Sequence, residues 1–416
     1  MPAGLPGVSN SDLSLYRVLD PGIMANPYPL YRALREHDPV HWDPYMHTWV
    51  ATTYADVVTV LKTYSAARAP SLESLRQLRF PLCERLVGMM WQQMMFMDGA
   101  MHARLRNICA SAFTTRRLEE VATTIERVSD ALIDKVIESG QMDVVADFAN
   151  PLPAIITAKL LGVPPEDHQQ LQNWANDVAE WLGNLQLHPN RIVEIARSLD
   201  NLNQYFTEKL EEQRRCPTGG LIHSLMTAEA DGERLTDEQI IANSIITLIG
   251  GHETTTSLIA MGFLTLLQKP EAFEHLRRCP EIMGSAVEEL LRFESPVQHT
   301  VRIATEDTML SGKMIQKGAR VVVVLAAANR DPDRFPEPDR LNLLRSDNRH
   351  LAFGWAAHFC FGAALARLEA KIAFTKLLGR LSHPQLIAND WQWRCNAGLR
   401  GLTRLNIRFD SALSLA

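Results

Sequence analysis

The sequence predicts a mainly α-helical protein with small β-sheets, folded as a single domain over residues 1–416. Its 416 residues are 46% hydrophobic and 22% charged, which is the composition of a globular chain with a sizeable core. Apolar residues recur at spacings of three and four through most of residues 100–280, as in helices that bury one face. No repeat, low-complexity tract or Gly/Ser linker divides the chain. These observations favour one helical body with minor sheets.

The first elements are a short helix and a hairpin. The stretch 30–36 has helical spacing, and VHWDPYMHTWVAT at 40–52 alternates aromatic and polar residues around a turn that contains proline. A small sheet is therefore expected to begin here.

The middle of the chain is expected to be helical in six stretches. They are 101–113, 117–138, 151–161, 166–183, 190–213 and 236–267. The last of them opens with Thr236 as an N-cap, followed by an acidic residue and an amide in the first turn. It is apolar almost all round, which indicates a core helix.

Two glycines, Gly250 and Gly251, interrupt this helix halfway. A glycine inside a helix costs about 1 kcal/mol relative to alanine. We therefore expect close backbone approach or a local distortion there. Beyond it we expect a helix at 280–293, strands at 299–303 and 320–325, a coil rich in Pro, Asp and Arg at 329–348, and a helix at 362–381.

A single cysteine stands in a glycine-containing loop directly before that last helix. The loop reads Phe353-Gly-Trp-Ala-Ala-His358-Phe-Cys360-Phe-Gly362. A sulfur anion at a helix N-terminus is stabilised by amide N–H groups and by the positive end of the helix dipole. A buried, inert cysteine is the alternative for any single residue of this type.

This loop resembles the haem-binding loop of the cytochromes P-450, Phe-Gly-x-Gly-x-His/Arg-x-Cys-x-Gly. The resemblance implies that Cys360 ligates haem iron, with Phe353 and Gly362 beside the cofactor. A thiolate ligand pushes electron density onto iron and favours O–O cleavage. One residue departs from the pattern, because Ala356 replaces the second glycine, and this puts the local loop geometry in doubt.

Two further motifs appear in the order of that family. Glu289-Leu-Leu-Arg292 matches its Glu-x-x-Arg element, with both charges on one helix face. The resemblance implies a buried pair that holds the Pro/Asp/Arg coil. His102-Ala-Arg-Leu-Arg106 resembles the helix that reaches the haem propionates, and the resemblance adds His358 and Arg302 as further propionate partners.

A fourth motif is Gly250-Gly-His-Glu253-Thr254, which resembles the part of the long central helix that crosses the oxygen-binding face of the haem. The resemblance implies that Glu253 and Thr254 relay protons. A zinc site is excluded because an HExxH motif needs histidine where the sequence has Thr256. A threonine in a helix can also simply bond back to the carbonyl four residues earlier, here that of Gly250.

Together these motifs imply a haem-thiolate monooxygenase that uses haem b and O₂ on a small apolar or natural-product-like substrate. The sequence has no reductase motif, so NAD(P)H serves only indirectly, through a ferredoxin-type donor and its reductase. Arg104, Arg116 and Arg117 are candidates for a local positive patch facing that donor. The alternatives are a peroxygenase, redox-neutral or coupling enzyme of the same fold, and a non-enzymatic haem sensor.

Substrate contacts are expected from two segments. Helical steps back from Thr254 place Gly250, Thr247 and Ile246 on one face. The resemblance adds a wall made of Val297, Gln298 and His299. The Met-rich run at 89–99 overlaps the variable substrate loop of the family.

The remaining composition argues against several classes of partner. The net charge of −6 disfavours a nucleic-acid platform. Six dispersed cysteines without a CxxC pair favour a reducing compartment. The first residues do not read as a secretory signal, and the apolar runs are too short to span a bilayer. We therefore expect a cytoplasmic protein with no membrane partner.

Overall fold

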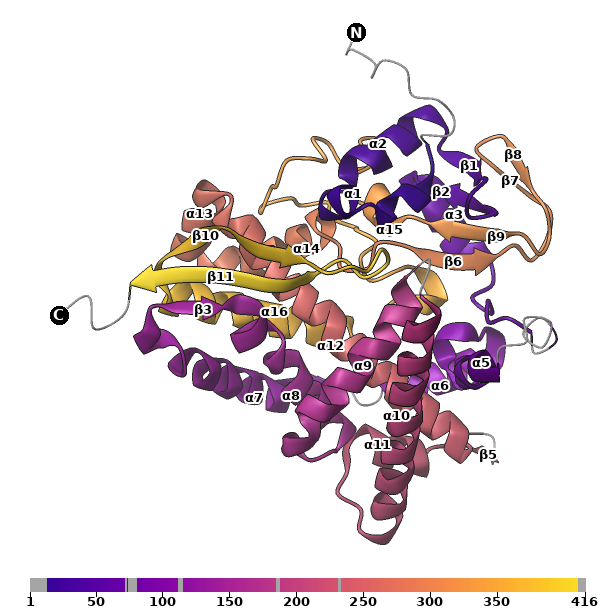
Figure 1. Ribbon diagram of the computed structural model, residues 1–416, viewed down its shortest axis with the longest axis horizontal. Helices are drawn as coiled ribbons and strands as arrows, with labels where there is room; N and C mark the ends of the chain where they lie inside the picture. Colours follow the sequence, from indigo (N-terminus) through magenta and orange to yellow (C-terminus); the bar gives the residue numbers. More distant parts are fainter. Residues whose placement is uncertain are drawn as a thin grey trace.

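Helices make up most of the chain, and small sheets lie along their side (Figure 1). The computed structural model describes residues 13–71, 73, 81–110, 115–184, 188–230 and 233–410. The α-helices are α1 (Pro21–Ala25), α2 (Tyr28–His37), α3 (Tyr54–Thr63), α5 (Pro81–Gln92), α6 (Gly99–Ala110), α7 (Thr115–Asp134), α8 (Pro151–Leu161), α9 (His168–Gly183), α10 (Pro189–Arg215), α11 (Gly220–Thr227), α12 (Asp237–Leu267), α13 (Pro270–Arg278), α14 (Met283–Phe293), α15 (Leu325–Ala328) and α16 (Ala363–Arg380).

All six helical stretches expected in the middle of the chain are present, with ends that differ by a few residues. Residues 111–113 of the first expected stretch lie outside the described part. Helices α1, α3, α5, α11, α13 and α15 were not predicted. Each is short, so its apolar spacing gives a weak signal in the sequence.

The predicted hairpin is the start of a four-stranded sheet with the order β1-β2-β9-β6. Trp42 of β1 lies opposite Trp49 of β2, and β2 pairs in parallel with β9 far along the chain. A second sheet has the order β10-β11-β3, and two small hairpins complete the strands. The strands are β1 (Val40–Asp43), β2 (Thr48–Ala51), β3 (Gln141–Asp143), β4 (Glu229–Ala230), β5 (Glu233–Arg234), β6 (Thr300–Ile303), β7 (Thr308–Leu310), β8 (Lys313–Ile315), β9 (Arg320–Val323), β10 (Ser382–Trp393) and β11 (Leu402–Asp410).

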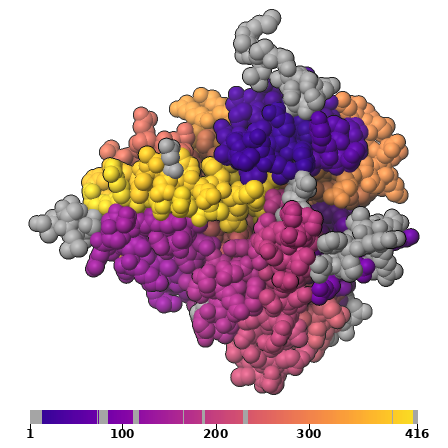
Figure 2. All heavy atoms as spheres, viewed as in Figure 1, coloured from indigo at the N-terminus to yellow at the C-terminus, as the bar shows by residue number. Residues whose placement is uncertain are grey.

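The C-terminal hairpin of β10 and β11 contacts the N-terminal helix α1 and pairs with β3. In the space-filling view it forms a band between the N-terminal segment and the segment that contains α7 and β3 (Figure 2). Arg400, in the turn of this hairpin, donates hydrogen bonds to the carbonyls of Met24 and Ala25 and pairs with Glu294 at 3.0 Å. Arg400 thereby links helix α1 to Glu294, the C-cap residue of helix α14.

Helix α12 is the central element and is buried along most of its length. Its start carries a full capping box, in which Thr236 and Gln239 each bond the other's backbone N–H. The helix continues through Gly250 and Gly251 without interruption, so the expected distortion is absent. Close approach explains Gly251, since a Cβ there would lie 2.7 Å from Thr157 Oγ1 of α8.

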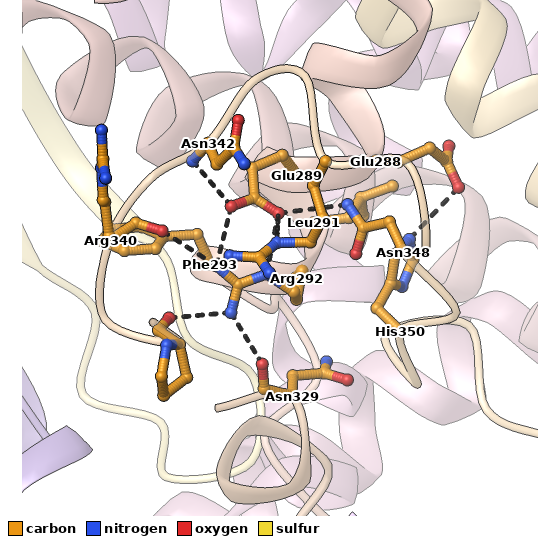
Figure 3. A network of polar contacts seen from close by, with 12 residues as sticks. Glu288, Glu289, Leu291, Arg292, Phe293, Asn329, Arg340, Asn342, Asn348 and His350 are labelled. Atoms are coloured by element: carbon orange, nitrogen blue, oxygen red, sulfur yellow. Dashed lines mark hydrogen bonds and ion pairs between the residues drawn. The ribbon is translucent and has the colours of Figure 1, made fainter. Parts of the chain in front are cut away.

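The ion pair expected between Glu289 and Arg292 is formed, and both side chains are fully buried (Figure 3). Arg292 makes two hydrogen bonds of 2.8 Å to the carboxylate and donates to three backbone carbonyls between Asn329 and Arg340. The Glu289 carboxylate also accepts from Asn342 N–H, Arg345 and Asn348. One buried charge pair therefore fixes the coil between α15 and the cysteine loop.

Among the described residues, one helical stretch is apolar enough to cross a membrane by length and composition alone. It covers Val144–Leu161, and 61% of it is buried inside the fold. A core helix has the same properties, so this stretch is explained by the packing of α8 against α12.

Candidate active site

One large cavity lies between helix α12 and the loop that leads into α16. Its volume is about 920 Å³, and its wall is mostly apolar. It brings together nearly all of the predicted site residues, although they come from distant parts of the sequence. The predicted residues that border it are His102, Arg106, Ile246, Thr247, Gly250, Glu253, Thr254, Val297, His299, Arg302, Phe353, His358, Cys360 and Gly362.

The thiol of Cys360 borders this cavity at the N-terminus of α16. The backbone N–H of Cys360 donates to the carbonyl of Phe353 at 2.8 Å, which closes the loop. Burial raises the pKa of the Cys360 thiol, while the N–H of Gly362 and the guanidinium of Arg106 oppose this shift. Desolvation outweighs these two effects, so the neutral thiol is favoured, and a positive ligand is what would offset the cost of burying the thiolate.

The loop needs two residues with left-handed backbone. Gly354 has φ +73°, and Ala356 has φ +54° at the position where the family pattern has glycine. An L-residue in this region carries strain of about 1–2 kcal/mol. The glycine pattern therefore reflects backbone angle, and Ala356 keeps that angle at the cost of strain.

A cationic and aromatic wall faces the loop. His102 and His358 stack with ring centroids 4.0 Å apart, and His358 Nε2 lies 3.2 Å from Asp98 Oδ1. Burial lowers the pKa of both imidazoles, that of His358 to about 4. Arg302 is buried with its Nε unpartnered, and burial lowers the pKa of its guanidinium to about 10. Within the described residues, the Arg302 guanidinium of this wall has no ion-pair partner at salt-bridge distance.

Two arginines in this wall were not predicted from the sequence. Arg68 donates to the carbonyls of Ala66 and Met95 and lies over the ring of Phe96 at 4.4 Å. Arg320, at the start of β9, borders the same cavity. Arg68 lies in a segment without a periodic pattern, and Arg320 is a single arginine at the start of the predicted strand 320–325, so no sequence signal pointed to either as a site residue.

Helix α12 presents Ile246, Thr247, Gly250 and Thr254 to the cavity, as the helical steps predicted. A Cβ on Gly250 would meet no atom within 4 Å, so this glycine leaves open space. The hydroxyl of Thr254 donates to the carbonyl of Gly250 at 2.8 Å. The back-bonded conformation considered for this threonine is the one adopted.

Glu253 borders the cavity but is almost fully buried, and its carboxylate pairs with Arg394. Arg394 follows β10, so the ion pair joins α12 to the C-terminal hairpin. The neighbouring His252 bonds the Asn150 side chain at 2.9 Å. The expected link from Glu253 toward solvent would therefore have to pass Arg394, which the sequence did not predict.

The wall expected after Pro296 is only partly correct. Val297 and His299 border the cavity, whereas Gln298 does not. Gln298 is buried, accepts from the Tyr31 hydroxyl at 3.0 Å and donates to the carbonyl of Ser295 at 2.6 Å. The extended backbone alternates its side chains, so the middle residue of the three points away. From the Met-rich run, Met90, Met94, Met95 and Phe96 also line the cavity.

Comparison with known proteins assigns the family. The cytochrome P450 family model matches residues 42–278 and 280–386. The chain is 35% identical over 400 residues to the biotin biosynthesis cytochrome P450 of Bacillus subtilis, covering 93% of this chain and 97% of that one. It is 35% identical over 392 residues to the vitamin D(3) 25-hydroxylase of Pseudonocardia autotrophica, covering 92% and 93%.

Solved structures agree with this assignment. P450BioI in complex with acyl carrier protein ligated to hexadec-9Z-enoic acid has a TM-score of 0.87 and 34% identity, covering 94% of this chain and 99% of that one. The myxobacterial CYP267B1 in complex with myristic acid has a TM-score of 0.86 and 35% identity, covering 95% and 99%. The chain therefore belongs to the cytochrome P450 family and is a monooxygenase that carries thiolate-ligated haem b, uses O₂ and receives electrons from NAD(P)H through redox partners.

Proposed function

We propose that this monooxygenase inserts one oxygen atom into an apolar small molecule that lies in the cavity between Cys360 and helix α12. The observation that carries the proposal is this single cavity, because a thiol at a helix N-terminus and a Gly/Thr helix face border the same apolar space. We also propose that residues 1–416 form one haem-binding domain, since the family match runs through most of them.

The residues around the cavity fit a haem. A flat, apolar macrocycle suits the mostly apolar wall, and the Cys360 thiol is available to a metal at its surface. Arg302 offers a buried, unpartnered Nε, and no ion pair of Arg106 or Arg302 occurs within the described residues. Anionic propionate groups would satisfy this unpaired positive charge.

We assign Cys360 as the iron ligand, with Phe353 and Gly362 packed beside the macrocycle. We assign the contacts to the haem propionates to His102, Arg106, Arg302 and His358. When bound, the thiolate-ligated haem supplies the activation of O₂ that favours O–O cleavage. The role of the loop is to hold the sulfur at the helix N-terminus, where the Gly362 N–H limits its basicity.

Thr254 and Glu253 are assigned to proton delivery on the α12 side. The hydroxyl of Thr254 donates to Gly250 O, so its oxygen can accept a hydrogen bond from a water in the space beside Gly250. Glu253 can pass protons only when its pair with Arg394 loosens. The presence of this acid and alcohol favours O₂ chemistry over the peroxygenase, redox-neutral and sensor alternatives.

The substrate is proposed to be elongated and largely apolar. Ile246, Thr247, Val297 and His299 would contact it, together with methionines of the 89–99 run. Relatives support this class, because their structures hold hexadec-9Z-enoic acid, testosterone or myristic acid. Adaptable methionine side chains suit such ligands.

Electrons are proposed to come from a separate ferredoxin and its reductase. Arg104 of α6 and the exposed Arg117 of α7 are the candidate positive patch for an acidic donor, while the side chain of Arg116 lies outside the described residues. We place the protein in the cytoplasm, where NAD(P)H is available.

The test is turnover with purified surrogate ferredoxin, its reductase and NADH. Wild-type holoprotein should form an oxygenated product from an apolar ligand that binds. Cys360→Ser should lose both the CO-bound spectrum of thiolate ligation and this turnover, whereas Cys395→Ser should keep both. A thiolate spectrum retained in Cys360→Ser, or product formed with peroxide but not with O₂ and NADH, would contradict the proposal.

A further inference from the structure

A second charge pair lies beside the Glu289–Arg292 pair and faces the cysteine loop. Glu288, the preceding residue of α14, accepts two hydrogen bonds from Arg367 of α16, at 2.7 and 2.8 Å. The Glu288 carboxylate also lies 3.3 Å from Nε2 of His350 (Figure 3). The side chains of Glu288 and Arg367 are 27% and 37% exposed, whereas that of His350 is buried. This pair therefore joins α14 to α16 in a partly desolvated position.

Both partners of Glu288 stabilise its ionised form. Nδ1 of His350 accepts a hydrogen bond from the N–H of Ala352 at 3.2 Å, so Nε2 carries the ring proton and donates it to the carboxylate. Burial alone would raise the pKa of Glu288, but the hydrogen bonds from Arg367 and His350 lower it to about 2. The guanidinium of Arg367 is always protonated. One full negative and one full positive charge therefore stand side by side here at neutral pH.

Arg367 reaches the cysteine loop through Phe353. Its guanidinium lies 4.5 Å from the centroid of the Phe353 ring, and the carbonyl of Phe353 accepts the N–H of Cys360 at 2.8 Å. Phe353 borders the cavity, whereas Arg367 and Glu288 do not. The charge pair is therefore outside the cavity but only one side chain away from the haem site.

Fixed charges this close to a redox centre change how easily it accepts an electron. A nearby cation stabilises the added negative charge and raises the reduction potential, and a nearby anion lowers it. Because Arg367 and Glu288 carry opposite charges at adjacent positions, their effects largely cancel in the wild-type protein. Removing either charge leaves the effect of the other uncompensated.

We propose that the Arg367–Glu288 pair sets the reduction potential of the haem bound at Cys360, with Arg367 raising that potential and Glu288 lowering it. The inference rests on the assignment of Cys360 as the iron ligand under the proposed function. Glu288 also holds the guanidinium against the Phe353 ring through its two hydrogen bonds. Both are positioning residues, since neither side chain borders the space in which the substrate is oxidised.

The experiment measures the haem reduction potential of the holoprotein by spectroscopic titration with small redox dyes, without ferredoxin. Wild type is compared with Glu288→Gln, Arg367→Gln, Arg367→Lys and the double variant Glu288→Gln/Arg367→Gln. Lys376→Gln is the matched control, because Lys376 also lies on α16 and pairs with Asp130 at 2.7 Å, with a side chain 27% exposed. It is about 14 Å farther along the helix than Arg367. The CO-bound spectrum of each variant reports whether thiolate ligation is kept.

Arg367→Gln should lower the ratio of reduced to oxidised haem at a fixed potential about three- to tenfold, a shift of about 30–60 mV at about 59 mV per tenfold. Glu288→Gln should shift the potential upward by a similar amount. Arg367→Lys and the double variant should stay near wild type, and Lys376→Gln should change the ratio less than about twofold.

Shifts of the two single glutamine variants in the same direction, or no shift in either, would overturn the inference and leave the pair with a purely structural role. If Glu288→Gln does not retain haem, Arg367→Gln against Arg367→Lys still decides the sign of the effect. A role of Arg367 in contacting an electron donor would not move a potential measured with dyes alone. A thiolate spectrum retained by Cys360→Ser would contradict the ligand assignment instead, and it is read independently of these shifts.

Discussion

Replacing Glu289 by glutamine should cost far more stability than its small chemical change suggests. All the contacts to this carboxylate come from donors: two from Arg292, and one each from Asn342 N–H, Arg345 and Asn348. In glutamine an NH₂ group takes the place of one carboxylate oxygen, and at either position this NH₂ would face only other hydrogen-bond donors. Glutamine therefore keeps the volume of the side chain but loses every hydrogen bond that the replaced oxygen accepted.

The magnitude follows from burial. Both members of the Glu289–Arg292 pair are fully buried, and breaking such a pair costs about 3–5 kcal/mol because the remaining charge is left uncompensated. Total stabilities of folded domains are about 5–15 kcal/mol. The coil that Arg292 holds leads directly to the cysteine loop, so haem retention should fall together with stability.

The chain offers a matched control with the same spacing. Glu274 and Arg277 on α13 form an i,i+3 pair at 2.9 Å, but their side chains are 40% and 49% exposed. Exposed pairs contribute below about 1 kcal/mol. Urea unfolding followed by circular dichroism and haem absorbance should give a large loss for Glu289→Gln and almost none for Glu274→Gln. Similar midpoints for the two variants would refute the argument from burial.

Three further changes test other parts of the structure. Ala356→Gly should be neutral or stabilise by up to about 1 kcal/mol, because Ala356 has positive φ, whereas Ala357→Gly should destabilise by about 0.5–1 kcal/mol in thermal unfolding. Burial lowers the pKa of His252 to about 3, so between this value and about 6.5 only the unfolded chain binds the proton. The free energy of unfolding should therefore decrease as the pH is lowered, by up to about 1.4 kcal/mol per pH unit. His252→Gln should flatten this slope between pH about 4 and 7. Thr254→Ala should retain haem and consume NADH but lower product formed per NADH about tenfold, with more peroxide released.

Each of these has a clear contrary result. Equal losses for the two glycine variants would show that loop strain at Ala356 is negligible. A pH slope unchanged by His252→Gln would mean that other groups carry the titration. An unaltered product yield in Thr254→Ala would leave this hydroxyl with its bond to Gly250 as its only role.

Elements with strong local signals were predictable from the sequence. The capping residue Thr236 and the continuous apolar pattern defined α12, and the i,i+3 spacing placed Glu289 and Arg292 on one face. The pairing of β2 with β9 was not predictable, because it depends on contacts between segments far apart in the chain. Short helices such as α13 were missed for lack of a long periodic pattern.

Within the site, predictions based on helical geometry held better than those based on loops. Thr247 and Gly250 border the cavity because a helix repeats its face regularly. Gln298 was wrongly placed there, since the backbone before β6 turns its side chain toward Tyr31. Arg320 and Arg394 were missed because single arginines in strands or turns give no periodic signal.

The parallel pairing of β2 with β9 has a consequence for synthesis on the ribosome. Trp49 and its partner Val321 are separated by about 270 residues. At roughly 5–20 residues per second, the first strands wait for about 15 to 55 seconds before their partner exists. During that interval the edge of β2 is an open template for wrong pairing. Cys360 is made later still, so a haem ligated by Cys360 could not protect the unfinished sheet during this interval.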